Sequence, residues 1–303
     1  MNQDPGGSPA QQDAAGLAEF VAHRTLLFTV AYELLGTAAD AEDVLQEVWL
    51  RWADVDHAGV RDPRAFLVRI TTRLGLNRLR TLARRRETYV GEWLPEPLLT
   101  VPDVAQDVEL ADSLSTAMLL VLESLGGTER AVFVLREVFG FSHAEIAEAV
   151  GKSPDNVRQI ARRARKHVAA RRPHARVSAA ERDTVLARFR AAIAGGDLQQ
   201  LLDVMAPDVV LRTDGGGRVQ AAINPIFGVE KVLRFLSGIM PQDVGLDPVW
   251  VNGSPGIAVR VGGVLDAVAT AQVHEGRITD LYVVRNPEKL TRLDLDAPVP
   301  VSR

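Results

Sequence analysis

The segment FSHAEIAEAVGKSPDNVRQIARRARKHV, residues 141–168, restricts the fold of this chain more than any other stretch. It predicts a short amphipathic helix from about Ser142 to Val150, a break at Gly151, and a second helix opened by Ser153 with Pro154 behind it. Two helices joined by such a turn are typical of a helix-turn-helix. The apolar seam between them is predicted to contain Ile146, Ala147, Val150, Val157 and Ile160.

The second helix of this motif carries a polar face whose residue types suit DNA contact. Helices that enter the major groove use their N-terminal turns to reach base edges, while phosphate contacts fix their position. Base readout is therefore predicted for Asp155, Arg158, Gln159 and Arg162, and phosphate contact for Arg163, Arg165 and Lys166. An ordinary helical hairpin with a charged outer face is the alternative.

Charge is strongly segregated along the chain, although the net charge is only -4. Residues 61–86 hold nine Arg and one Asp, and residues 152–176 hold nine Lys or Arg and one Asp. Between them, residues 87–129 hold nine Asp or Glu and no Lys or Arg. Two basic blocks can bind phosphates at two places, while the acidic connector competes for the same cationic surfaces or imitates the nucleic acid. Solvated helix faces are the alternative for either block alone.

Length and composition describe a soluble chain with several compact parts. A chain of 303 residues suggests two or three units, and 47% hydrophobic with 24% charged residues is typical of globular proteins. The absence of cysteine excludes disulfides and thiolate zinc sites. Residues 1–16 lack signal-peptide features and are predicted to be a disordered tail, and no apolar run is long enough to span a bilayer, so we expect a cytoplasmic protein.

The N-terminal half is predicted to be helical. LAEFVAHRTLLFTVAYELLG ends at Gly36, and a second helix follows with Thr37 as its cap. Its acidic face, next to core tryptophans, suggests a protein partner with basic residues; this face contains Asp40, Asp43 and Glu47, with Glu42 and Gln46 alongside. A basic helix then starts at Pro63, with its apolar residues Phe66, Ile70 and Leu74 facing inward.

The connector contains GEWLPEPLL at residues 91–99. A tryptophan with two prolines gives a stiff, extended and partly apolar peptide that needs a docking surface. The alternative is that Trp93 packs back onto the N-terminal helices.

Residues 181–293 change in character and predict an α+β domain. Two helices and a strand are followed by a helix at GVEKVLRFLSGI and by a run of strands separated by glycine turns, which implies a cone with a curved antiparallel sheet around a pocket. After the first strand, the glycines of Asp214–Arg218 allow positive φ and close approach of another backbone. A plain turn is the alternative, and no nucleotide fingerprint is present.

Catalysis in this domain would need an acid and a base that converge in the pocket. The candidates show no such pattern; they are Arg212, Asp214, Asp266, His274 and Tyr282. We therefore expect no enzyme activity, no metal site and no cofactor.

Three stretches together carry a family resemblance. DAEDVLQEVWLRW, DPRAFLVRITTRLGLNRLR and LREVFGFSHAEIAEAVGKSPDNVRQIARRARK resemble, in order and spacing, the σ2 and σ4 domains of extracytoplasmic-function sigma factors over about residues 17–172. The element order behind them resembles the SnoaL-like branch of the NTF2-like fold. With WLPEP, DGGGR and NPEKL, the whole chain is similar to SigJ-type sigma factors.

This resemblance implies a multidomain fold of two all-α domains followed by an α+β cone. The expected parts are a tail (1–16), σ2 (17–88), an acidic linker (89–111), σ4 (112–172), a short linker (173–180), the SnoaL-like domain (181–293) and a second tail (294–303). A helix of σ4 is expected to begin at about Val108.

The resemblance also implies partners and the residues that meet them. Core RNA polymerase would be bound at its β′ clamp helices and its β flap, and the first of these contacts would involve Asp40, Asp43, Gln46 and Glu47. Promoter DNA would be read at the minus-ten element by Arg61, Arg64, Arg69, Arg73 and Asn77. The minus-thirty-five element would be read by Ser153, Asp155, Asn156, Arg158, Gln159, Arg162, Arg163 and Lys166. The acidic linker would thread into polymerase channels that nucleic acid normally occupies.

Finally, the resemblance implies that the C-terminal domain contacts the linker and replaces a separate anti-sigma factor. The expected contact residues are Trp93, Leu94, Pro95, Asp214, Gly215, Gly216, Gly217, Arg218, Asn286 and Pro287. Whether the pocket takes a small ligand is left open. The competing hypothesis is a free-standing, one-component DNA-binding regulator with an NTF2-like sensor domain, which would not need the acidic face at residues 40–47.

Overall fold

The computed structural model describes residues 9–102, 108–171, 177–239, 243–293, 295 and 297–302. The chain divides into two compact units. The helical unit comprises Met1–Leu82, Leu125–Ala169 and Val301–Arg303, and the sheet unit comprises Ala83–Ser124 and Ala170–Pro300. No helix within the described ranges is long and apolar enough to cross a membrane.

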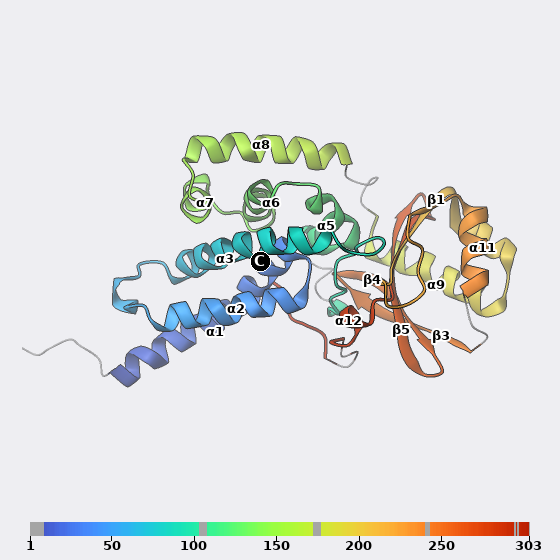
Figure 1. Ribbon diagram of the computed structural model, residues 1–303, viewed down its shortest axis with the longest axis horizontal. Helices are drawn as coiled ribbons and strands as arrows, with labels where there is room; N and C mark the ends of the chain where they lie inside the picture. The colour runs from blue at the N-terminus through green and yellow to red at the C-terminus, as the bar shows by residue number, and fades with distance from the viewer. Residues whose placement is uncertain are drawn as a thin grey trace, which may run out of the picture. The chain divides into compact units, whose positions relative to one another are not determined.

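The helical unit is built from long helices whose ends follow local sequence signals (Figure 1). Its elements are α1 (Pro9–Leu35), α2 (Ala38–Ala53), the 3-10 turn His57–Gly59, α3 (Pro63–Arg86), α6 (Gly127–Phe133), the π-helical turn Val134–Val138, α7 (His143–Val150) and α8 (Pro154–Arg171). The Thr37 side chain accepts a hydrogen bond from the Asp40 backbone N–H, so the predicted cap of α2 is present. The basic helix starts at Pro63 as predicted, and of its expected inward residues Leu74 is buried while Phe66 and Ile70 are half-buried.

The expected N-terminal tail is wrong for residues 9–16, which form the first turns of α1. The reason is a tertiary contact that composition does not reveal. The indole Nε1 of Trp52 donates a 2.7 Å hydrogen bond to the buried carbonyl of Gly16, and the His57 ring lies against the same glycine. Residues 1–8 lie outside the described part of the chain.

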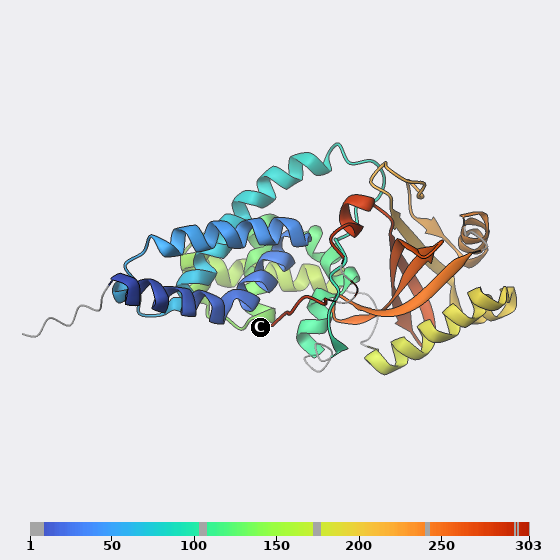
Figure 2. The same ribbon diagram turned by 90° about the horizontal axis from the view of Figure 1, so that it is seen from below.

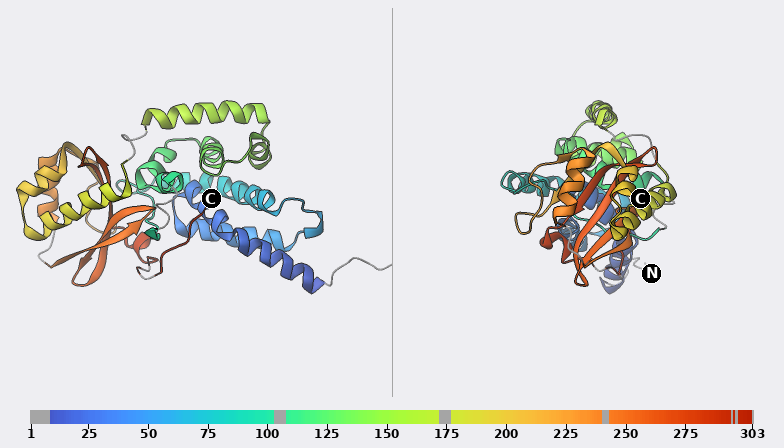
Figure 3. Two further views of the ribbon diagram at one scale, coloured as in Figure 1. Left: turned by 180° about the vertical axis from the view of Figure 1, so that it is seen from behind. Right: turned by 90° about the vertical axis from the view of Figure 1, so that its right-hand side faces the viewer.

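The predicted helix-turn-helix is confirmed by α7 and α8 (Figure 3). Ser142 and Glu145 form a reciprocal capping box at the start of α7, and Gly151 ends it in the left-handed conformation with φ of 66°. The seam between the helices contains Ile146, Ala147, Val157 and Ile160, all buried, while Val150 is half-buried.

The sheet unit contains one six-stranded sheet that is covered on both faces (Figures 1 and 2). Its helices are α4 (Val108–Leu114), α5 (Thr116–Glu123), α9 (Ala179–Gly195), α10 (Leu198–Val204), α11 (Val229–Ile239) and α12 (Pro287–Leu290). Its strands are β1 (Met205–Asp214), β2 (Ile226–Phe227), β3 (Val244–Val251), β4 (Ser254–Val261), β5 (Val264–His274) and β6 (Arg277–Val284), in the order β2-β1-β6-β5-β4-β3. The helix expected from about Val108 is therefore present.

The expected antiparallel sheet is present except for one parallel pair of strands. Strands β3 to β6 form an antiparallel meander, but β1 pairs with β6 in parallel, with Leu211 opposite Leu281. The chain leaves β1, passes through β2 and α11, and enters the meander at the far edge, so β6 returns beside β1 in the same direction.

The two faces of the sheet have separate apolar cores, because side chains alternate along each strand. On one face α9, α10 and α11 cover a core that includes Phe189, Leu211 and Leu281. On the other face Val268, Tyr282 and Val284 pack with linker residues Leu94 and Leu99 and with Ala117 of α5. Figure 2 shows α9 and α11 on one side of the sheet and the linker with α12 on the other.

Two further boundaries differ from expectation. The short linker at 173–180 ends earlier, because Ser178 caps α9 and the helix begins at Ala179. The C-terminal tail is not loose where it is described, since the backbone N–H of Val299 donates to the Leu99 carbonyl at 2.8 Å. Within the helical unit, the Ser302 N–H likewise donates to the Thr29 hydroxyl at 3.1 Å.

Candidate DNA-contacting surfaces and linker anchor

The polar face of α8 is exposed along its whole predicted DNA-contacting set. Ser153 accepts a hydrogen bond from the Asn156 N–H, and Arg158 forms an ion pair with Asp155. Further along, Arg165 lies 3.0 Å from Glu137. Exposed residues of this set are Ser153, Asp155, Asn156, Arg158, Gln159, Arg162, Arg163, Arg165 and Lys166. One continuous face of one helix thus presents cations and amide groups, as groove recognition requires.

The arginines of α3 that were assigned to the minus-ten element contact the end of α7 within the helical unit. Arg73 donates to the carbonyls of Glu148 at 2.8 Å and Ala149 at 3.4 Å, and Arg69 lies 3.4 Å from the Glu148 carboxylate. The Arg64 guanidinium stacks 4.4 Å above the Phe141 ring. Free carbonyls at a helix C-terminus carry partial negative charge and attract such cations.

Contacts with α7, and with Phe141 just before it, therefore occupy three of the five residues predicted to read the minus-ten element. The other two differ: Arg61 is exposed, and Asn77 accepts a 2.9 Å hydrogen bond from Arg80. This helix-to-helix contact was not predicted, because it joins segments about 75 residues apart.

The acidic face of α2 is only partly exposed, which corrects the prediction for Asp40. That carboxylate is buried and lies 2.6 Å from Arg78, which also contacts Asp43 at 2.8 Å. Glu47 pairs with Arg51 one turn later at 2.7 Å, and Gln46 is exposed. Asp43, Gln46 and Glu47 are thus accessible to a partner, whereas Asp40 positions Arg78.

A buried charged pair joins α1 to α6. Arg130 donates from Nε to the Glu33 carbonyl at 2.9 Å, and both side chains are buried. Burial lowers the pKa of Arg130 to about 10, while the charge of Glu33 acts in the opposite direction. The two charges hold the first helix of the unit to the helix that precedes the helix-turn-helix.

In the sheet unit, Asp214 at the end of β1 binds the linker through its fully buried carboxylate. One oxygen accepts the Tyr89 hydroxyl at 2.5 Å and the Gly216 N–H at 3.0 Å. The other accepts the Leu94 N–H at 2.9 Å and lies 2.7 Å from the Lys289 ammonium. We call these residues, together with Trp93 and Asn286, the linker anchor.

Lys289 is the buried cation of the linker anchor. Its ammonium donates to the Leu94 carbonyl and lies 4.3 Å from the centre of the Trp93 ring. The Arg86 guanidinium lies 3.8 Å from the centre of the same ring. Burial lowers the pKa of Lys289, and the Asp214 charge opposes that shift. Burial also raises the pKa of the Tyr89 hydroxyl, and the hydrogen bond to Asp214 adds to this effect.

The glycine loop after β1 is shaped by close approach, as its composition predicted. Gly216 has φ of 59°, and a Cβ there would lie 2.4 Å from the Asn286 amide nitrogen. Gly217 has φ of 68°, and a Cβ there would meet Val90 of the linker at 3.0 Å. Asn286 donates to the Tyr89 hydroxyl at 2.8 Å and caps α12, in which Pro287 is the first residue.

The remaining predicted contact residues surround this arrangement. Arg218 forms an exposed ion pair with Glu288 at 2.7 Å, and Pro95 is buried in the linker. Gly215 has no room for a side chain, because a Cβ there would lie 2.6 Å from the Val219 carbonyl oxygen. The structure therefore brings the WLPEP, DGGGR and NPEKL segments together.

A second linker contact extends the edge of the sheet beside β3. Leu98 and Asn252 exchange hydrogen bonds of 2.6 and 2.7 Å, and the Thr100 N–H donates to the Trp250 carbonyl at 3.0 Å. Leu99 bridges Val251 in antiparallel fashion. The linker thus adds a short strand to an edge that would otherwise expose unpaired backbone groups.

Tyr89, Lys289, Asn252 and Thr100 were missed by sequence reasoning. Glycine turns were expected between the strands, but nothing local showed that the Asn252 amide would bind the linker. Lys289 is part of NPEKL, yet a lysine in a sequence is normally expected to be exposed.

The candidate catalytic residues do not converge. Arg212 pairs with Glu92 at 3.4 Å and shares a pocket with Tyr282, whose pKa is raised by burial. Asp266 lines a different cavity, where it pairs with Arg285 at 2.9 Å. Among the residues that the structure describes, no cluster of His, Asp and Glu could hold a metal ion.

Family models match the helical regions in the expected order: Sigma-70 region 2 over residues 20–85 and Sigma-70 region 4 over residues 115–168. The chain belongs to the extracytoplasmic-function family of RNA polymerase sigma factors, and its function is promoter recognition in transcription initiation. The hypothesis of a free-standing regulator is not favoured.

Within this family the chain is of the SigJ type. It is 38% identical over 294 residues to the ECF RNA polymerase sigma factor SigJ of Mycobacterium tuberculosis, which covers 91% of this chain and 93% of the relative. It is 32% identical over 283 residues to the probable ECF sigma factor SigI of the same species, covering 91% and 95%. The crystal structure of M. tuberculosis SigJ matches with a TM-score of 0.75 and 36% identity over 92% of this chain and 99% of that one, so the shared architecture includes the C-terminal α+β domain.

Proposed function

We propose that this sigma factor is regulated from within its own chain, by a C-terminal domain that holds the linker between the two DNA-reading regions. The observation that carries the proposal is the buried Asp214 carboxylate, which binds Tyr89 and the Leu94 backbone N–H on the linker. A buried carboxylate with four donors holds the linker in one position, because any displacement of the linker leaves charged groups without their partners.

The docked linker cannot at the same time enter a polymerase channel. Its residues 94–100 are buried, with Leu94 and Leu99 in the second core of the sheet and Leu98 and Thr100 on the β3 edge. Engagement with core RNA polymerase therefore requires the linker anchor to open, and the C-terminal domain sets how readily this happens.

We further propose that the α3 arginines must leave α7 before they can read the minus-ten element. Arg69 and Arg73 are held by the carboxylate and the terminal carbonyls of α7, and these partners compete with DNA phosphates and bases for the same guanidinium groups. The exposed face of α8 would read the minus-thirty-five element.

The proposed partners are core RNA polymerase and promoter DNA. Asp43, Gln46 and Glu47 form the accessible acidic surface for the β′ clamp helices, and a second contact is expected at the β flap. Because the restraining element is part of the chain, the proposed regulation needs no separate anti-sigma factor and no catalytic activity. The site of action is the cytoplasm, where polymerase and chromosome are.

Run-off transcription with purified core polymerase, from a promoter located by start-site mapping, tests the regulation. Asp214→Ala and Trp93→Ala should each raise transcription at least about threefold, and the double variant should not exceed the stronger single, because both side chains contact Lys289 and belong to the same anchor. The matched control is Asp247→Ala, which removes an exposed ion pair with Arg260 from the same sheet.

Removal of residues 178–303 is the second arm of this experiment. Transcription equal to that of the full chain, or full additivity of the two substitutions, would mean that the C-terminal domain is a passenger or senses something unrelated to the linker. A shorter truncation that keeps part of the domain is expected to be more active than either extreme, because the domain also helps to position the linker.

A further inference from the structure

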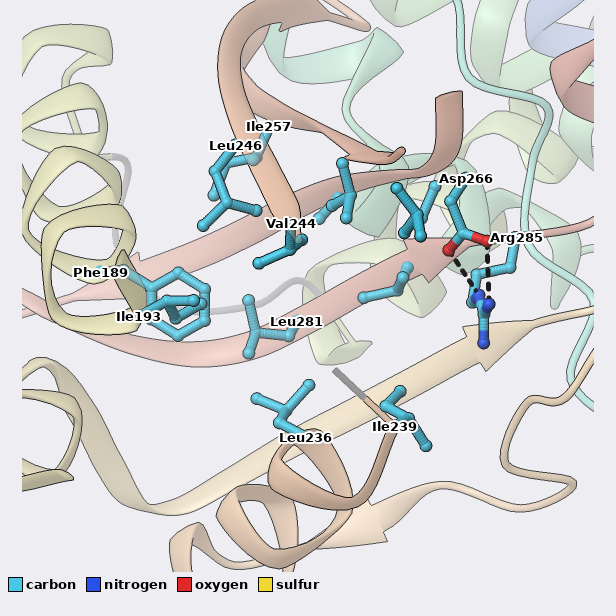
Figure 4. Close-up of a pocket in the computed structure, with 15 residues that line it drawn as sticks. Phe189, Ile193, Leu236, Ile239, Val244, Leu246, Ile257, Asp266, Leu281 and Arg285 are labelled. Atoms are coloured by element: carbon cyan, nitrogen blue, oxygen red, sulfur yellow. Dashed lines mark hydrogen bonds and ion pairs between the residues drawn. The ribbon is translucent and has the colours of Figure 1, made fainter. Parts of the chain in front are cut away.

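The core between the sheet and its covering helices is not completely filled. A cavity of about 80 Å³ lies between β3 to β6, α9 and α11 (Figure 4). Protein interiors are close-packed, and voids much larger than one water molecule are few. The walls are formed by apolar side chains that include Phe189, Ile193, Leu236, Leu246, Ile257 and Leu281.

Water is a poor occupant of this cavity. A buried water needs two to four polar partners, and these walls are hydrocarbon apart from one ion pair. The rim is made of large apolar side chains that are only half-buried, among them Leu236, Ile239 and Val259. Such a rim can yield, and a somewhat larger dry cavity of about 150 Å³ is known to accept a benzene ring. The dimensions therefore suit a molecule of single-ring size.

The ion pair at one end of the cavity restricts the charge of the occupant. Figure 4 shows Asp266 and Arg285 together at one end, away from Phe189 and Ile193. The guanidinium fork donates to both Asp266 oxygens, at 2.9 and 3.0 Å, so the pair neutralises itself. An anionic or cationic occupant would lose its hydration without gaining an unpaired countercharge, whereas an uncharged molecule would not.

Arg285 also connects the cavity with the linker anchor. Its Nη1 donates to the Gln220 carbonyl at 2.7 Å, in the loop that follows Asp214, and its backbone N–H donates to the Asp214 carbonyl at 2.7 Å. The next residue is Asn286, which holds the Tyr89 hydroxyl. One side chain thus touches the cavity, the glycine loop and, through its own backbone, the residues that bind the linker.

We infer that this cavity is a binding site for a small, uncharged, hydrocarbon-rich molecule of single-ring size, and that Arg285 couples its occupancy to linker docking. An occupant packs against the Asp266–Arg285 pair and orders it. Ordering of Arg285 fixes the loop at Gln220, so that less conformational freedom is lost when the linker docks. A filled cavity therefore strengthens docking, and the regulatory reading of this effect rests on the function proposed above.

Fluorobenzene is the probe for the site, followed by fluorine NMR on the full-length chain. We expect saturable binding that Ala269→Leu abolishes, because the added carbons fill the cavity, and that Ala191→Leu on the exposed face of α9 leaves unchanged. Val259→Phe at the rim repeats the test if Ala269→Leu does not fold. The anion 4-fluorobenzoate should bind at least tenfold more weakly. Lack of saturation with fluorobenzene, or equal binding of both probes, would overturn the assignment.

Hydrogen exchange of the Leu94 amide measures the coupling, because that amide binds Asp214 only when the linker is docked. Saturating fluorobenzene should slow its exchange at least threefold in the wild type. Arg285→Lys keeps the positive charge but cannot donate the paired hydrogen bonds of the guanidinium to Asp266. In this variant fluorobenzene should still bind, but it should not slow exchange of the Leu94 amide. An unchanged rate in the wild type would refute the coupling. The proposed regulation is judged separately, by the effect of Asp214→Ala on transcription without any probe.

Discussion

Replacement of Asp214 by alanine should release the linker by an amount that follows from its hydrogen bonds. The carboxylate accepts two donors from the linker, the Tyr89 hydroxyl and the Leu94 N–H. A hydrogen bond to a charged group contributes about 1.5 to 3 kcal/mol, so the loss of both lowers the free energy of linker opening by about 3 kcal/mol or more. At 1.4 kcal/mol per factor of ten, opening becomes at least about 10²-fold more frequent.

The pair with Lys289 adds to this loss. The Lys289 side chain is only 9% exposed, and its ammonium would stay beside the linker without its countercharge. Removal of one partner from a buried pair typically costs about 3 to 5 kcal/mol, whereas an exposed pair contributes about 1 kcal/mol or less. Asp247→Ala is the control, because Asp247 pairs with Arg260 while 55% of its side chain is exposed.

Native-state hydrogen exchange at Leu94 is the appropriate assay, because a chain with two compact units does not unfold in one step. Exchange should accelerate about 10²-fold or more in Asp214→Ala and less than threefold in Asp247→Ala. If Leu94 exchanges at the wild-type rate in Asp214→Ala, the carboxylate does not hold the linker in solution, and the reasoning fails.

Three further predictions concern other surfaces and pH. Reversal of Asp43 and Glu47 to lysine should abolish co-elution with core polymerase while the circular dichroism spectrum stays unchanged, because both are exposed; retained co-elution would remove them from the interface. Arg158→Ala or Arg162→Ala should weaken the free energy of promoter binding by about 1 to 3 kcal/mol and relax selectivity at one upstream base pair, as measured by binding to a set of point-substituted promoters. An equal loss of affinity on all of these promoters would make the two arginines phosphate contacts. The contribution of Tyr89 to docking stability should be complete below pH 10 and fall above it, since the Tyr89 pKa is raised above its ordinary value of 10.0 in the docked state; carbon-13 NMR of labelled tyrosine should find this pKa moving back toward 10.0 in Asp214→Ala, and no movement would contradict the assigned cause.

Helix ends could be predicted because their signals are local. Thr37 caps α2, Ser142 and Glu145 cap α7, and Gly151 takes the left-handed conformation that ends it. The parallel pairing of β1 with β6 could not, because it joins residues about 70 positions apart and leaves no pattern in either strand. The same holds for residues 9–16, whose helix is stabilised by the distant side chain of Trp52.

The linker anchor was predictable only where composition was unusual. A tryptophan between prolines and a run of three glycines drew attention to Trp93 and to the loop after Asp214, and the resemblance placed them in one contact. Lys289 and Tyr89 complete the anchor, but their burial depends on how β1, α12 and the linker meet. Asp40 was assigned to an exposed face for the converse reason, since helical periodicity cannot show that Arg78 covers it.

The linker and the cavity occupy opposite faces of the same strands. Along β5 and β6, Val268, Tyr282 and Val284 face the linker, whereas Ala267, Ala269, Leu281 and Val283 line the cavity. Release of the linker leaves Leu94, Leu99 and the sheet face that they cover exposed to water, which is unfavourable for both surfaces. Opening is therefore favoured only when another surface takes up the linker, and core polymerase is the partner that can supply one. A chain that lacks the whole domain also exposes these leucines. Deletion therefore removes the anchor that restrains the linker and, at the same time, the apolar sheet face that covers it. This explains why a partial truncation, which keeps the strands that cover these leucines but removes Asn286 and Lys289 from the linker anchor, should be the most active form.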